Sequence, residues 1–123
     1  MRLATVMRLN AASCLGFGAL FVILPGVVAT GLGSAPAGLV FALGLGLLGN
    51  AALLWLAVRN GRQPRRAEVL FFCIGDLGWV LATLALIWAG LWIIAPLGQA
   101  SALIVAAAVG AMGLMQWRAL PAA

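Results

Sequence analysis

Two long stretches without a charged side chain dominate this sequence. Residues 9–58 form 50 consecutive uncharged positions, and residues 77–117 form another 41. A helix needs about 20 apolar residues to cross the hydrocarbon core of a bilayer, so each stretch is long enough to cross twice. The sequence therefore predicts an all-α membrane protein whose four-helix transmembrane bundle is a single domain over residues 1–123.

The composition supports a membrane location. Hydrophobic residues make up 66% of the chain and charged residues only 7%, whereas about 25% of the residues in a soluble domain are charged. The net charge of +5 comes from seven arginines, and the chain has no lysine. No basic face or aromatic platform accompanies these arginines, as nucleic-acid binding would require. We expect the lipid bilayer to be a partner and nucleic acid not to be one.

Glycine and proline mark the breaks between the expected helices, because they free or fix the backbone and remove helical hydrogen bonds. Such residues occur in 31–36, in 59–66 and in 90–99. The predicted helices therefore cover residues of about 5–29, 36–58, 67–89 and 98–118.

Pro25 lies near the end of the first expected helix and can kink it or end it. A helix that stopped at Leu24 would be short unless it began near Leu3. We therefore expect a kink.

The arginines predict the orientation of the bundle. They lie near the start of the first helix, in the second connection and after the last helix, whereas the other two connections carry no charge. The positive-inside rule places such residues in the cytoplasm, and both termini with them. The seven positions are Arg2, Arg8, Arg59, Arg62, Arg65, Arg66 and Arg118, of which the middle four form a cytoplasmic basic loop.

The residue types that are absent exclude several chemistries. Without histidine the chain lacks the usual ligand of haem, copper and zinc, and without lysine it has no Schiff-base or phosphate-loop amine. Its two cysteines, Cys14 and Cys73, do not form a Cys-x-x-Cys motif. We expect no cofactor, no metal and no enzymatic activity.

Asp76 is an acid within a long apolar segment. It lies about ten residues, or roughly 15 Å, from Arg66 along the expected helix, and a charged aspartate at that depth costs about 2.5–3.5 kcal/mol. Asp76 should therefore face the bundle interior. Helical spacing places Cys73 on the same face, and the Trp79 ring is expected to lie over the acid. Asn50, at nearly the same depth in the second helix, is the expected hydrogen-bond partner.

Burial without a nearby cation favours the neutral form of Asp76. Two roles remain open for this candidate site. In the functional alternative the acid is a proton or cation site, and in the structural alternative it joins the second and third helices by a hydrogen bond.

Small residues at four-residue spacing predict close packing between helices. Rows of this kind occur at Ala42 and Gly46 and at Ala106 and Gly110, and a shorter one begins at Ala12. In one interpretation, such rows serve packing within the bundle. In the alternative, one such face, on the last expected helix, packs against another protein or a second copy.

Four short motifs resemble those of uncharacterised small four-helix bacterial inner-membrane proteins. They are Pro25-Gly26, the Gly-to-Pro connection at 31–36, Ala57-Val58-Arg59, and Asp76-Leu77-Gly78-Trp79. The resemblance covers residues 8–90 and implies no activity. It implies a multi-pass location in the bacterial inner membrane.

These patterns lead to two functional hypotheses. The first is a non-enzymatic integral membrane protein, a structural or accessory subunit that packs against a larger membrane complex or as a homo-oligomer. The alternative is a small proton-coupled transporter that uses Asp76 as its coupling site.

Overall fold

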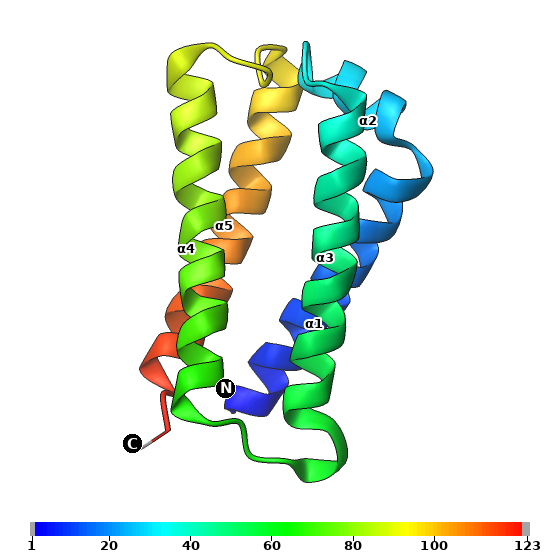
Figure 1. The fold of residues 1–123 in the computed structure, drawn as a ribbon. Coiled ribbons are helices and arrows are strands. Elements are labelled where there is room, and N and C mark those ends of the chain that lie inside the picture. The colour runs from blue at the N-terminus through cyan, green and yellow to red at the C-terminus, as the bar shows by residue number, and fades with distance from the viewer. Residues whose placement is uncertain (1, 122–123) are drawn as a thin grey trace.

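A computed structural model describes residues 2–121, which fold into a bundle of helices (Figure 1). Within these residues, four helices are long and apolar enough to cross a membrane, which confirms the expected number of spans. The elements are α1 (Leu3–Ile23), α2 (Pro25–Leu32), α3 (Ala37–Val58), the 3-10 turn η1 (Arg59–Gly61), α4 (Arg66–Ala89) and α5 (Pro96–Arg118).

The first helix is interrupted at Leu24, so the prediction of one continuous, kinked helix is wrong. Leu24 has non-helical dihedral angles, with φ −126° and ψ 53°, and Pro25 then begins α2. Proline is suited to the first position of a helix because an N–H group at that position would have no partner within the helix. The span survives the break because α1 begins at Leu3 and is 21 residues long.

The long helices form two antiparallel pairs. α1 packs mainly against α3, and α4 packs mainly against α5. Contacts of α1 and of α2 with α5 hold the two pairs together. Figure 1 shows α4 and α5 on one side of the bundle and α1 and α3 on the other.

Two glycines allow the close approach of α1 and α3. A Cβ atom at Gly44 would lie 2.8 Å from Phe21 Cβ and 3.0 Å from the Gly18 carbonyl oxygen. A Cβ atom at Gly18 would meet Leu48 and the Gly44 carbonyl oxygen at similar distances. The small-residue rows predicted close packing, but this pair is not in them: Gly46 has no atom within 4 Å of a Cβ position.

The two connections at one end of the bundle are joined by backbone hydrogen bonds. The amides of Ile94 and Ala95 both donate to the Leu32 carbonyl, at 2.9 and 3.0 Å, and the Ser34 amide donates to the Trp92 carbonyl at 3.1 Å. Gly98 allows this junction because a Cβ atom there would lie 2.6 Å from the Gly31 carbonyl oxygen. These bonds tie α2 to the start of α5.

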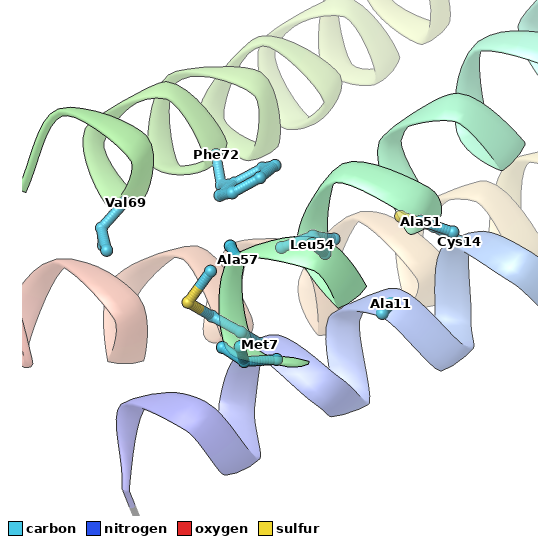
Figure 2. Close-up of a cluster of buried hydrophobic side chains, with 9 residues drawn as sticks. Met7, Ala11, Cys14, Ala51, Leu54, Ala57, Val69 and Phe72 are labelled. Atoms are coloured by element: carbon cyan, nitrogen blue, oxygen red, sulfur yellow. The ribbon is translucent and has the colours of Figure 1, made fainter. Parts of the chain in front are cut away.

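A cluster of buried apolar side chains fills the opposite end (Figure 2). Met7 from α1, Leu54 from α3 and Phe72 from α4 point toward one another there. Leu54 and Met7 are fully buried. Three helices from both pairs therefore share one core at this end.

That same end carries the arginines. Figure 1 places the start of α1, the end of α5 and the η1 connection together, and Arg66 Nη1 donates to the Pro121 carbonyl at 3.1 Å. The structure thus gathers the basic residues at one end of the bundle, as the sequence predicted. Which side of a membrane this end faces stays a prediction.

Substitution of Gly44 by alanine should destabilise the bundle, whereas Gly46→Ala should not. The new methyl group at position 44 must displace Phe21 or the α1 backbone, and overpacking of this kind costs about 1–3 kcal/mol. Unfolding in mixed micelles, followed by circular dichroism, measures the difference. Equal stability of the two variants would show that α1 and α3 do not approach closely at Gly44.

Candidate polar site in the bundle interior

Asp76 lies on the inner face of α4. The buried residues of this helix, Val69, Phe72, Asp76 and Thr83, recur at helical spacing and so form one stripe. The exposed fraction of Asp76 is 6%. The acid therefore faces the bundle interior, as its position in an apolar segment predicted.

Two side-chain amides hold the carboxyl group of Asp76. Asn10 Nδ2 in α1 donates to Asp76 Oδ2 at 3.1 Å, with a longer contact of 3.4 Å to Oδ1. Gln116 Nε2 in α5 donates to the same Oδ2 at 3.1 Å. Asn10 Nδ2 also donates to Gln116 Oε1 at 2.9 Å, which closes a triangle. The three residues, which we call the amide–acid triangle, connect α1, α4 and α5.

Gly113 permits this arrangement by leaving space beside the acid. A Cβ atom at Gly113 would lie 3.0 Å from Asp76 Cβ and 3.4 Å from Asp76 Oδ2. α5 can therefore bring Gln116, one turn further along, within hydrogen-bonding distance of the carboxyl group. Asn10 and Gln116 are both almost completely buried, with exposed fractions of 1% and 0%.

Asn50 is not a direct partner of Asp76, so the expected pair is wrong. Asn50 Nδ2 donates to Cys14 Sγ at 3.4 Å, and Cys14 Sγ donates to Asn10 Oδ1 at 3.5 Å. Asn50 thus reaches the acid only through Cys14 and Asn10. The prediction matched the depths of the two residues but not their directions. Asn10 donates to Asp76, whereas Asn50 donates to Cys14 of α1, the helix against which α3 packs.

The sequence reasoning missed Asn10 and Gln116 because both lie near helix ends. A signal was present in each helix. Asn10, Cys14 and Gly18 recur every four residues and are all buried in α1. Gln116 lies three residues after Gly113, on the same face of α5.

Cys73 and Trp79 lie beside the triangle. Gln116 Nε2 donates to Cys73 Sγ at 4.0 Å, and Cys73 Sγ donates to the Gly113 carbonyl at 3.5 Å. The Trp79 ring stacks on Phe21 of α1, with centroids 6.5 Å apart. Trp79 thereby links the two helix pairs, and it lines the same cavity as Asp76. The position of the ring over the acid stays a prediction.

Asp76 borders two cavities. One of about 160 Å³ lies among all four long helices and is also lined by Asn10, Asn50 and Trp79. The other, of about 400 Å³, lies between α4 and α5 and is also lined by Cys73. The acid therefore separates a partly polar interior space from an apolar groove.

The amide–acid triangle contains no cation. Among residues 2–121 the single ion pair joins Arg62 to Glu68, at 3.0 Å, in the basic loop. The Arg65 amide also donates to Glu68, at 2.9 Å, whereas Arg59 and Arg66 are exposed. The basic loop is thus separate from the candidate site.

The part of the chain that the structure describes, residues 2–121, has no group of three or more Cys, Asp or Glu side chains placed to hold a metal ion. Every buried side-chain nitrogen or oxygen in that range has a hydrogen-bond partner. The absence of metal, cofactor and enzymatic activity stays a prediction from the residue types.

Comparison with known proteins adds no relative. No protein-family model, no curated protein and no solved structure matches the chain. The resemblance to small four-helix bacterial inner-membrane proteins stays a prediction.

Replacement of Asn10 by leucine should destabilise the bundle more than the same replacement of Asn50. Asn10→Leu removes donors from both Asp76 and Gln116, and a buried polar group left without its partner costs about 1–3 kcal/mol. Asn50→Leu removes one weak bond to sulfur. Unfolding free energies in mixed micelles test this order, and a larger loss for Asn50→Leu would contradict the triangle.

Proposed function

We propose that this chain is a non-enzymatic integral membrane protein, a structural or accessory subunit that packs against a larger membrane complex or against copies of itself. In this proposal it spans the bacterial inner membrane with both termini in the cytoplasm. The observation that carries the proposal is the amide–acid triangle, in which the chain's interior polar groups bond to one another.

The triangle supports this function because its polar groups bond to one another and not to a substrate. Asp76 Oδ2 accepts hydrogen bonds from two amides of the same chain, and Asn10 Nδ2 serves both Asp76 and Gln116. Catalysis needs reactive groups that converge on a substrate. Here the polar groups converge on one another and stabilise the contact of three helices. The outer apolar surface is then the part of the protein that meets other molecules.

The positions of the small residues indicate where another helix can approach that surface closely. Ala106 of α5 is buried within the bundle, and a Cβ atom at Gly110 would lie 3.4 Å from Val80 of α4, so this row serves internal packing. Gly38, Ala42 and Gly46 follow one another at four-residue spacing on α3 and are exposed. A Cβ atom at Gly38 or Gly46 would meet no other atom within 4 Å. We therefore expect a partner helix or a second copy to pack against the exposed row on α3, and not against the last helix.

Gly46→Leu should reduce the size of the native assembly while leaving the monomer folded. A leucine there keeps helix α3 intact but prevents another helix from approaching its backbone closely. Gly78→Leu on α4 is the matched control, because Gly78 is exposed and its Cβ position is equally open. Native electrophoresis of mildly solubilised membranes measures the assembly. A wild-type chain that migrates as a monomer would refute the accessory function.

A second candidate function, a small proton-coupled transporter, is favoured by the two cavities that meet at Asp76. Intramembrane acids commonly mark proton pathways. Of the two carboxyl oxygens, Oδ1 has only the 3.4 Å contact with Asn10. Oδ1 is therefore the oxygen more available to a proton that arrives from either cavity.

The Asp76→Asn variant separates the two functions. A transporter should stay folded and lose proton-coupled flux in vesicles that contain a pH-sensitive dye. A structural acid should show no flux to lose. It should instead lose stability, because the asparagine NH2 group replaces Oδ1 and turns a donor toward the Asn10 amide. The loss should be of the size of one interhelical hydrogen bond, which averages about 0.6 kcal/mol and reaches about 1.7 kcal/mol.

Infrared spectroscopy provides the control for this comparison. Glu68 is the only other acidic side chain in the sequence. A carboxylic-acid carbonyl band that is present in the wild type and lost in Asp76→Asn would confirm the neutral acid predicted from the sequence. Its absence in the wild type at neutral pH would contradict that prediction.

A further inference from the structure

A groove of about 370 Å³ runs between α1 and α3 on the outside of the bundle. α1 contributes Arg8, Ala11 and Ala12, and α3 contributes Ala51, Ala52 and Trp55. On each helix the lining residues recur at the three- and four-residue spacing of one helical face. Two such faces side by side, both with small side chains in the middle, form a shallow channel.

The groove has a polar end and an apolar end. α1 and α3 run in opposite directions (Figure 1), so Arg8 near the start of α1 lies level with Trp55 near the end of α3. Two turns along the helices, away from the arginine end of the bundle, Leu15 and Leu48 line the other end of the groove. The alanines between the two ends leave a space about seven residues, or roughly 10 Å, long.

Arg8 is exposed at this polar end and has no acidic partner within residues 2–121. The one ion pair of that range joins Arg62 to Glu68. Asp76, the other acid in the chain, is buried and bonded to Asn10 and Gln116. The arginine charge next to an apolar groove is therefore available to an anion from outside the protein.

We propose that the α1–α3 groove binds one anionic phospholipid. The phosphate pairs with the Arg8 guanidinium, which presents several N–H donors to an oxyanion. One acyl chain lies along the alanines toward Leu15 and Leu48. Trp55, with its side chain 54% exposed, lies at the headgroup boundary, where tryptophan is enriched.

Charge decides between this occupant and a transmembrane helix. An apolar helix that filled the groove would cover Arg8 and remove it from water without a counter-ion, which is costly. An anionic lipid supplies the counter-ion and the apolar chain in one molecule. The proposal rests on Arg8 and the groove, so it is independent of any function of Asp76.

The test measures lipid selectivity in reconstituted bilayers. Phosphatidylglycerol and phosphatidylcholine with brominated acyl chains quench nearby tryptophans, and subtraction of the Trp55→Phe protein isolates the Trp55 signal. We expect phosphatidylglycerol to bind about five times more tightly at this site, the contribution of one arginine at a membrane surface. Equal binding of the two lipids would overturn the proposal.

Variants separate the site from general surface charge. Arg8→Gln should remove the fivefold preference, whereas Arg118→Gln, at an exposed arginine outside the groove, should keep it. Ala52→Leu fills the groove and should reduce quenching by both lipids. An equal loss of preference in Arg8→Gln and Arg118→Gln would refute a specific site. Equal binding of the two lipids, together with binding of inorganic phosphate that Arg8→Gln abolishes, would refute a lipid site and indicate a site for a free anion.

Discussion

A carboxyl group in the apolar interior must form hydrogen bonds, because an unpaired polar group there costs several kcal/mol. Asp76 meets this requirement with one amide from α1 and one from α5. These hydrogen bonds therefore restrict the rotation of α1, α4 and α5 about their axes and their positions along those axes. Gly113 is part of the same constraint, because a side chain at that position would push α5 away from Asp76.

This constraint matters because the two helix pairs contact each other less than α1 contacts α3 or α4 contacts α5. α1 packs on α3 through Gly18 and Gly44, and α4 packs on α5, but these contacts act within each pair. Between the pairs, backbone hydrogen bonds at Leu32 join the connections at one end. The apolar cluster around Leu54 joins them at the other. The amide–acid triangle provides the polar attachment between these ends.

The surface follows a different rule from the interior. Arginine side chains gather at one end, where their charges can reach water and lipid headgroups. The rest of the exterior is mostly apolar, and it varies in shape more than in polarity. The groove that begins at Arg8 and the open face at Gly46 show this variation. In both proposals, recognition depends on shape along the helices and on charge at one end.

The sequence by itself determined the number of spans, the basic end and the inward direction of Asp76, because each follows from hydropathy, charge and helical period along the chain. Only the tertiary structure decided that Asn10 and Gln116, rather than Asn50, bind Asp76. It also decided that α1 packs closely against Gly44 of α3 and not against Gly46. These outcomes depend on which helices are neighbours and how each is rotated. Many pairings satisfy the same apolar pattern, so only packing distinguishes among them.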